Sequence, residues 1–382
     1  MSQTTHRAES KAVDQSLYLA LDLGWTQWHL AFTTEAGQKP RLRTVQARDL
    51  SALQEEIRRA KERFDLPVQA RVTSCFEAGR DGFWLHRYLL SIGVESRVVD
   101  SSSIEVNRRR RQAKTDRLDV IKLVGLLRQH EAKEKRVWSV VRVPSVAAED
   151  FRQLGRELEL LKKERTEHSN RIRALLAAQG VDLGSGASAL RRSFDLLRLW
   201  DGSELPPVLR ARLEREQQRL EFVDVQIREL EQQRKEQVKA PLCRAEEQVG
   251  KLLQLRAVGI KSAWLFVSEF FSWRQLRNRR QVGSLAGLAP TPYNSGKDLH
   301  HEQGISKAGN PRIRAMAIEI SWGWLRWQPD SELSQWFWSR FGKAGGRSRK
   351  VGIVALARKL LVALWRYLET GVVPAGAQLK PA

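Results

Sequence analysis

Residues 17–23 read LYLALDL, and after a turn at Gly24 residues 28–33 read WHLAFT. A third short run, at 41–47, follows the Gly-Gln-Lys-Pro turn at 37–40. Apolar runs of this length, joined by short turns that contain glycine, are typical of antiparallel strands. We therefore expect the ordered part of the chain to begin with three strands of one sheet.

Helical and extended patterns alternate beyond these strands. In 49–64 the apolar residues Leu53 and Ile57 share one helical face, and Asp49 is a suitable N-cap. The next predicted elements are a strand at 69–75, a helix around 80–92, a strand at 94–99 and a helix at 116–130. The order βββαβαβα predicts an α/β domain with a mixed sheet over residues 17–145.

Two long amphipathic segments follow within residues 146–245. Apolar residues recur three and four positions apart in both, at Phe151, Leu154, Leu158 and Leu161 and then at Leu213, Leu220, Val223, Ile227 and Leu230. A stretch with Gly and Ser near 180–188 separates the two segments. This pattern predicts either a helical hairpin or a coiled coil that joins subunits.

The last large region, 246–372, is basic and rich in tryptophan, and we expect it to be mainly helical with a loop at 287–311. Residues 1–16 are expected to form a flexible extension and residues 373–382 a tail. Five tryptophans crowd the segment after the loop, and packing in the core or at an interface, rather than base stacking, is expected for most of them: Trp322, Trp324, Trp327, Trp336 and Trp338.

The composition limits the class of protein. The 382-residue chain has 66 Lys and Arg against 44 Asp and Glu, a formal net charge of +22, which predicts a polyanionic partner such as nucleic acid. No apolar run approaches the ~18 residues of a membrane span, and the N-terminus lacks the apolar core of a secretory signal. Two lone cysteines, Cys75 and Cys243, provide neither a disulfide framework nor zinc spacing. We expect a cytoplasmic, nucleoid-associated bacterial protein with no membrane partner.

Four acidic residues occupy positions that fit a metal site. Asp22 lies in the first strand and Glu77 follows the fourth, while Asp116 and Asp119 are three apart on a later helix. An RNase H-like sheet would place the two strand acids side by side, with the helix packed above them. Carboxylates suit Mg²⁺ or Mn²⁺, and two such ions about 3.5–4 Å apart can clamp the oxygens of a phosphodiester. Each acid taken alone is more simply a surface or capping residue, but an acid inside an apolar strand is costly unless it is paired or binds metal.

Basic segments are candidates for contacts to nucleic acid. One run directly precedes the two helical acids and comprises Arg108, Arg109, Arg110, Arg111 and Lys114. It is either a solvated loop or, beside a metal site that handles phosphates, a contact to the nucleic-acid backbone, and we favour the second. A helix–Gly–helix turn at 255–263, which contains Lys261, is a weaker candidate for a phosphate site.

The loop at 287–311 contains a possible nucleophile. The hydroxyl of Ser295 could attack a phosphorus atom if a neighbouring group activates it, although a simple turn hydrogen bond is the plainer interpretation. Asn310 as N-cap and Pro311 at the first helical position predict a helix directly after the loop.

These ordered motifs resemble the DEDD transposases of the insertion sequence one-ten family. The resemblance rests on Asp22, FEAGRDG at 76–82, KTDRLD at 114–119, LAGLAPTPYNSG at 285–296 and GISKAGNPRIR at 304–314. It implies a RuvC-like (RNase H-like) domain at 17–145, a coiled-coil region at 146–245 and a C-terminal transposase domain at 246–372. The last motif resembles the subgroup of elements with terminal inverted repeats.

The same resemblance implies a recombinase that moves its element through a circular intermediate. A structured non-coding RNA, the bridge RNA, would pair with donor and target DNA. The metal-binding and catalytic quartet would be Asp22, Glu77, Asp116 and Asp119, holding two Mg²⁺ ions, with Mn²⁺ as a substitute.

The serine loop is matched to the nucleophile of that family. Ser295 is the best match and Ser306 the alternative, and the basic residues Lys307, Arg312 and Arg314 would bind nucleic acid with Lys261. A covalent phosphoserine would conserve the phosphodiester energy, and no GxxxxGK[ST] loop offers a nucleotide to drive resealing. The coiled coil would join subunits into a dimer or a tetramer that holds two duplexes.

Other functions fit parts of the pattern. The principal alternative is a RuvC-like nuclease that hydrolyses junction DNA with metal and water, without a serine nucleophile. The LDLGWT stretch at 21–26 also resembles the first phosphate loop of actin-like kinases and chaperones, but the second loop of that fold is not found. A non-catalytic RNA-binding scaffold fits the charge, although not the acid within an apolar strand.

Overall fold

The computed structural model describes residues 16–34, 38–79, 82–104, 116–134, 137–184, 186, 190, 194–294 and 300–381. For Ser102, Asp116, 291–294 and 300–303 it describes the backbone alone. The chain folds into two compact units, Met1–Pro144 and Ser145–Ala382. The expected extension at 1–16 lies outside the described residues apart from Ser16.

The first unit is built on one mixed sheet of five strands. These are β1 (Leu17–Leu23), β2 (Gln27–Thr33), β3 (Arg41–Gln46), β4 (Val72–Glu77) and β5 (Glu95–Val99), in the spatial order β3-β2-β1-β4-β5. β1, β2 and β3 pair antiparallel through short turns, while β1, β4 and β5 are parallel. Parallel neighbours need crossovers, which helices provide here. The mixed sheet was predicted, and it is consistent with a RuvC-like domain.

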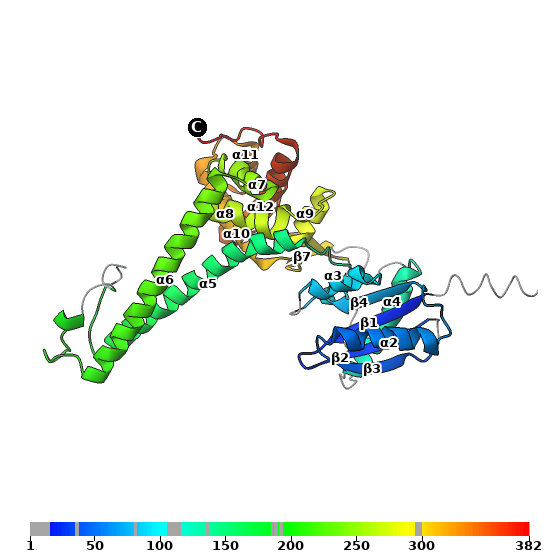
Figure 1. Cartoon of the computed structure of the whole chain (residues 1–382). Coiled ribbons are helices and arrows are strands. Elements are labelled where there is room, and N and C mark those ends of the chain that lie inside the picture. Colours follow the sequence, from blue (N-terminus) through cyan, green and yellow to red (C-terminus); the bar gives the residue numbers. More distant parts are fainter. Residues whose placement is uncertain are drawn as a thin grey trace, which may run out of the picture. The chain divides into compact units, whose positions relative to one another are not determined.

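Helices cover both faces of this sheet (Figure 1). On one face, α2 (Leu50–Arg63) and α3 (Trp84–Ser91) enclose a core that includes Leu19, Leu21 and Phe76. On the other, α4 (Asp116–Glu131) packs on Ala20 and Cys75. Because side chains alternate along a strand, β1 and β4 contribute to both layers. The short 3-10 turn η1 (Ser101–Ser103) follows β5.

The fourth strand differs from its expected limits of 69–75. Residues 67–70 form a turn in which the Ala70 N–H donates to the Pro67 carbonyl at 2.9 Å, so the strand begins only at Val72. It then continues to Glu77. Glu77 is therefore the last residue of the strand rather than the first residue beyond it.

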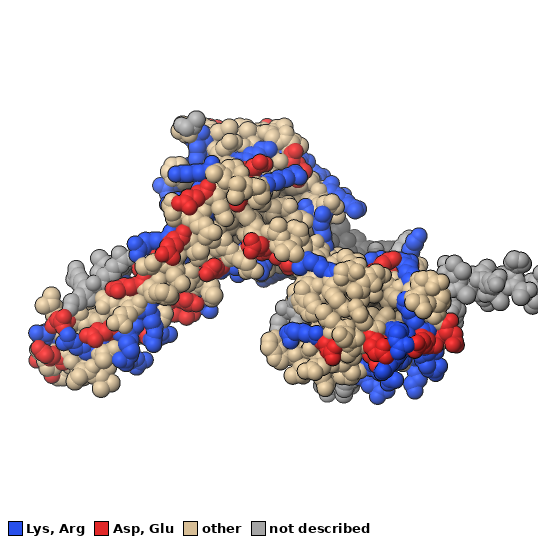
Figure 2. All heavy atoms as spheres, viewed as in Figure 1, with Lys and Arg blue, Asp and Glu red and all other residues tan. Residues whose placement is uncertain are grey.

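Two long antiparallel helices open the second unit, α5 (Val146–Ala177) and α6 (Pro207–Lys239), with the turn η3 (Phe194–Leu196) in their connection. Apolar residues of the predicted spacing pack between them, Leu158 and Leu161 with Val223 and Ile227 in one cluster. Figure 2 shows basic and acidic side chains next to each other along this hairpin. The predicted hairpin is present, and a coiled coil between subunits stays a prediction.

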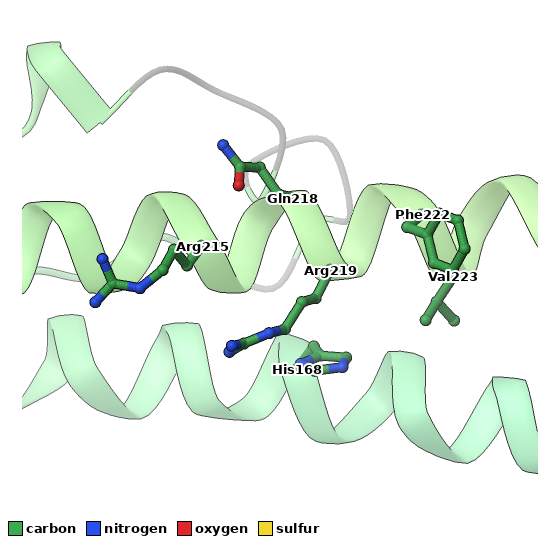
Figure 3. Close-up of a pocket in the computed structure, with 6 residues that line it drawn as sticks. All are labelled: His168, Arg215, Gln218, Arg219, Phe222 and Val223. Atoms are coloured by element: carbon green, nitrogen blue, oxygen red, sulfur yellow. The ribbon is translucent and has the colours of Figure 1, made fainter.

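One buried carboxylate joins the two long helices. Glu216 of α6 is 4% exposed and accepts hydrogen bonds from His168 Nδ1 (2.7 Å), Arg171 (2.8 Å) and Arg219 (2.7 Å). Figure 3 shows Arg219 of α6 directed toward His168 of α5, with Phe222 further along α6. The hairpin thus has polar pairing as well as an apolar seam.

The rest of the second unit is mainly helical, as predicted. Its elements are α7 (Arg244–Leu253), α8 (Ile260–Phe266), the π-helical η4 (Val267–Phe271), α9 (Arg279–Leu285), α10 (Pro311–Trp327), α11 (Glu332–Phe341) and α12 (Gly346–Thr370). They enclose a core that includes Trp264, Phe266 and Trp324. Asn310 caps α10 as expected, accepting from the Arg312 N–H at 3.0 Å.

Two features of this unit were not predicted. The segment expected as a loop contains a two-stranded antiparallel sheet, β6 (Pro290–Asn294) and β7 (His300–Ile305). The tail after α12 is held in place, because the Gln378 N–H donates to Gln328 (2.7 Å) and the Lys380 N–H to the Gln254 carbonyl (2.7 Å). In the part of the chain described, no helix combines the length and the apolar character of a membrane span.

Candidate active site

Asp22 and Glu77 sit at the same level of two neighbouring parallel strands. The register pairs Leu21 of β1 with Phe76 of β4, so Asp22 and Glu77 occupy the next step on each strand. Two residues earlier, Ala20 and Cys75 pack beneath α4. Because side chains alternate, both acids belong to the face that α4 covers. Asp22 is half-buried and Glu77 is exposed.

Two contacts give the direction of α4 relative to β4. Arg71, just before β4, pairs with Glu131 at the end of α4 (3.5 Å), and Cys75 Sγ lies 3.7 Å from the Leu123 carbonyl oxygen. The helix therefore runs antiparallel to the strand. A strand rises about 3.3 Å per residue and a helix about 1.5 Å. The two residues from Cys75 to Glu77 therefore span the same length as about four residues of α4, counted back from Leu123, which ends near Asp119.

Three acids from two strands and one helix are thus brought toward one end of the sheet. Asp119 is half-buried, and Asp116 begins α4, although its side chain is outside what the structure describes. Among the described side chains, no three His, Cys, Asp or Glu are already gathered as a metal site. The donors themselves are carboxylates, one of them half-buried in an apolar strand, and these fit Mg²⁺ or Mn²⁺.

Cys75 is close to the acids but does not compete with them chemically. It is fully buried, and burial together with the charge of Glu77 raises the pKa of its thiol above the ordinary value. The thiolate is the form that binds metal and attacks as a nucleophile. Cys75 therefore stays protonated at neutral pH and acts as a small core residue beneath α4.

His29 is a polar residue of this site that the sequence patterns did not single out. It lies opposite Asp22 in the β1–β2 pair, and its Nδ1 is within 3.0 Å of Thr44 Oγ1 on β3. Ala31, two residues along, packs on the α4 face, so His29 faces the same way. Counting outward from the Gly24 turn would have revealed this pairing.

The two glycine-containing motifs of the second unit lie against each other. Three backbone N–H groups, those of Ser306, Lys307 and Asn310, donate to the carbonyls of Ala289 (2.9 Å), Gly287 (3.2 Å) and Leu285 (3.0 Å), respectively. Gly309 has φ +128°, and a Cβ there would lie 2.4 Å from the Leu285 carbonyl oxygen. Backbone hydrogen bonds therefore hold the LAGLAP stretch against the SKAGNP stretch, and this contact positions both ends of the serine loop.

The other predicted site residues fall into three groups. Ser295, Arg108, Arg109, Arg110, Arg111 and Lys114 lie outside the described residues. Ser306 and Lys307 are exposed after β7, and Arg314 donates to the Lys307 carbonyl oxygen at 2.9 Å. Lys261 and Arg312 line a separate pocket with Glu269.

Known proteins resemble both parts of the chain. A family model described as a transposase, of the DEDD IS110 type, matches residues 19–179, and that of the transposase IS116/IS110/IS902 family matches residues 250–334. A putative transposase of Sinorhizobium fredii, y4rJ, is 41% identical over 96% of this chain and 95% of its own length. The transposases of insertion sequence elements IS1328 from Yersinia enterocolitica and IS1111A from Coxiella burnetii are each 26% identical, over 58% and 62% of this chain and 63% and 64% of their own lengths.

Proposed function

This chain belongs to the IS110 family of transposases, and from that we propose how it acts on DNA. It cuts and rejoins DNA strands through a covalent phosphoserine, with two divalent metal ions, Mg²⁺ or Mn²⁺, at the acidic end of its sheet. A bridge RNA selects the donor and target sites. The observation that carries the proposal is the shared register of Asp22 and Glu77 at the level of Asp119.

The four acids would hold the ions: Asp22, Glu77, Asp116 and Asp119. Bound metal ions neutralise the charge of phosphoryl oxygens during transfer. Backbone pairing holds Asp22 of β1 and Glu77 of β4 at the same level, and α4, which begins at Asp116, carries Asp119 over the same face of the sheet. This rigid support is what a phosphoryl-transfer site needs, because small displacements of the reacting groups reduce the rate strongly.

The serine provides the covalent step. Its oxygen forms a bond to phosphorus as the bond from phosphorus to a sugar oxygen breaks, and the proton of the hydroxyl passes to the leaving sugar oxygen. A second DNA hydroxyl then displaces the serine in the reverse reaction. One phosphodiester is exchanged for another, so no nucleotide triphosphate is consumed.

Ser295 is proposed as the nucleophile and Ser306 as the alternative. Lys307, Arg314, Arg312, Lys261 and the basic run before α4 are proposed to contact the nucleic acid. The α5–α6 hairpin is proposed to join subunits as a coiled coil, into a dimer or a tetramer. Apolar side chains on its outer surface support this: Leu160, Phe222 and Val225 are 56%, 64% and 41% exposed.

A denaturing gel for protein–DNA adducts tests the proposal. The protein is incubated with its flanking RNA, Mg²⁺ and labelled donor and target DNA, and we expect labelled DNA that stays attached to protein. Ser295→Ala should remove the adduct. An adduct that survives Ser295→Ala but not Ser306→Ala would identify Ser306 as the nucleophile.

The acids are tested in the same reaction with a matched pair of variants. Glu77→Gln should abolish adduct formation while RNA binding is retained. Glu62→Gln is the control, because Glu62 is 61% exposed on α2, which covers the opposite face of the sheet. Full activity of Glu77→Gln or Asp22→Ala would show that these acids are not the metal ligands. Metal-dependent cutting without any protein–DNA adduct would favour the hydrolytic nuclease.

A further inference from the structure

The second unit contains a basic pocket that is separate from the serine loop. It lies between α5, α6, α8, η4 and the start of α10. Six cationic side chains line it, namely Arg152, Arg156, Lys162, Arg234, Lys261 and Arg312. Only two acids share the lining, Glu159 and Glu269.

Arg234 is buried in this lining without an acceptor. Its residue is 6% exposed, its Nε has no hydrogen-bond partner among the described residues, and it makes no ion pair with any described carboxylate. Burial lowers the pKa of its guanidinium, which nearby Glu231 only partly offsets. A buried N–H of a guanidinium without an acceptor is costly, so an anion that accepts from Nε of Arg234 would stabilise it.

A second buried donor lines the same pocket. Trp264 is 1% exposed, and its indole Nε1 has no acceptor among the residues described. Gly155 of α5 packs against the edge of this ring, and a Cβ there would lie 3.3 Å from Nε1 and 3.1 Å from Cδ1. A larger residue at this position would therefore press on the N–H edge of the ring.

The positive charge around the pocket exceeds what its buried acid neutralises. Glu269 accepts two hydrogen bonds from Arg156 (2.7 and 3.1 Å) and one from Arg312 (3.3 Å). Behind it, burial and the charge of Arg152 lower the pKa of Arg274 to about 10, against the opposing effect of Glu269. Other carboxylates pair with most of the remaining cations of the lining, Glu159 with Arg312 (3.2 Å), Glu231 with Lys162 (2.6 Å) and Glu149 with Arg152 (3.8 Å). Among the lining cations of the described chain, Arg234 is therefore the one without a carboxylate partner, and an anion in the pocket would supply it.

We propose that this pocket binds a backbone phosphate of nucleic acid, with Arg234 and Trp264 as donors and Arg156 and Arg312 at its mouth. Guanidinium and N–H donors match the oxygens of a phosphate. The inference rests on the proposed function to the extent that DNA or RNA is the polyanion that supplies the phosphate. The two sources share this chemistry, so the experiment distinguishes them.

Binding of short labelled oligonucleotides to the full chain, measured over a series of salt concentrations, tests the pocket. Arg234→Gln is compared with Arg228→Gln, which removes the same charge from an exposed position of the same helix. We expect Arg234→Gln to bind roughly tenfold more weakly and to reduce the salt slope by about one, whereas Arg228→Gln stays close to wild type. Single-stranded DNA, duplex DNA and RNA are compared. The polymer whose affinity falls most in Arg234→Gln is the one that supplies the phosphate.

A charge-neutral variant keeps the test decisive if Arg234→Gln does not fold. Gly155→Ala narrows the pocket without changing the net charge, and it should weaken the same oligonucleotide. Inorganic phosphate should raise the melting temperature of the wild type more than that of Gly155→Ala.

Unchanged affinity and salt slope in the folded variants would overturn the proposal. So would a melting temperature of the wild type that phosphate does not raise. Neither result bears on the phosphoserine, which the adduct assay reads independently of this pocket.

Discussion

His29 of β2 lies directly opposite Asp22 of β1, and its ring is held by Thr44 of β3, with Nδ1 and Oγ1 3.0 Å apart. The three residues form a row across three strands on the face that α4 covers. A hydrogen bond to one ring nitrogen fixes the orientation of an imidazole. His29 is therefore placed to support the carboxylate of Asp22 as a positioning residue.

We expect His29→Ala to weaken Mn²⁺ binding and strand exchange by about 10–100-fold, because groups next to metal ligands tune the site to this extent. His29→Asn should recover part of the loss, since its amide can replace Nδ1. Mn²⁺ titration followed by electron paramagnetic resonance gives the affinity independently of turnover. Wild-type Mn²⁺ affinity in His29→Ala would show that the histidine only packs.

Gly309→Ala should disrupt the base of the serine loop. The residue has φ +128°, and the added Cβ would meet the Leu285 carbonyl oxygen, so the variant should lose about 3 kcal/mol of unfolding free energy and most adduct formation. Gly304→Ala is the control, because φ is +68° there with no atom within 4 Å of the added Cβ. Its cost should be about 1–2 kcal/mol. Equal urea midpoints for the two variants would contradict this reading.

Glu269→Gln should destabilise the second unit at neutral pH. Glu269 is 4% exposed and accepts hydrogen bonds from Arg156 and Arg312, whose side chains are 44% and 42% exposed, so the substitution weakens charge-assisted hydrogen bonds at a cost of about 1.5–3 kcal/mol. Glu229→Gln, at an exposed position of α6, should change the unfolding free energy by less than about 0.5 kcal/mol. Urea denaturation of all three proteins provides the comparison.

The same carboxylate predicts a dependence on pH. Burial opposes ionisation, but the hydrogen bonds of Arg156 and the charges of Arg152 and Arg312 hold the pKa of Glu269 below its ordinary value of 4.5. Its contribution to stability is complete above pH 4.5 and is lost as the pH falls through the lower folded value. The difference between wild type and Glu269→Gln should therefore shrink in acid. A constant difference would assign the loss to packing.

Phe222→Glu should weaken self-association of the chain. Phe222 is 64% exposed on the outer surface of the hairpin, and a charge there is incompatible with burial against a second copy. Leu196→Glu is the control, because Leu196 is 85% exposed on η3, outside the two long helices. Light scattering after size-exclusion chromatography should show a lower mass for Phe222→Glu alone. The same mass for both variants would move the subunit contact elsewhere.

The sheet and its two strand acids were predictable because their signals are local. Alternation in LYLALDL and WHLAFT determines which side chains share a face, and the turn at Gly24 determines that the strands are antiparallel. The position of Asp119 relative to the two strand acids could not be predicted from local patterns, because it depends on how α4 packs on Cys75. His29 stands out only once the first two strands are paired about the Gly24 turn, because cross-strand register is a property of the pair rather than of either strand.

The tryptophans show where local patterns are insufficient. Trp324 is fully buried and donates to Ser331 at 2.9 Å, as core packing predicts. Trp322, Trp327 and Trp338 are 44%, 56% and 42% exposed, so these three rings lie outside the core, and packing at an interface stays a prediction for them. Two of these rings lie beneath guanidinium groups, Trp327 with Arg326 and Trp338 with Arg349. Cation–π contacts can stabilise a ring at the surface without burying it.

The anchorage of α5 has a mechanical consequence. Its first turns are fixed to the C-terminal helices by the stacking of Phe151 on Trp264 (4.5 Å) and by the Arg156–Glu269 pair. The helix continues from Arg156 to Ala177, so it extends about 32 Å beyond that base as a stiff arm. A tilt of about 5° at the base would carry the far end through about 3 Å. A phosphate bound in the proposed pocket beside Arg156 would therefore act close to the point about which the hairpin tilts.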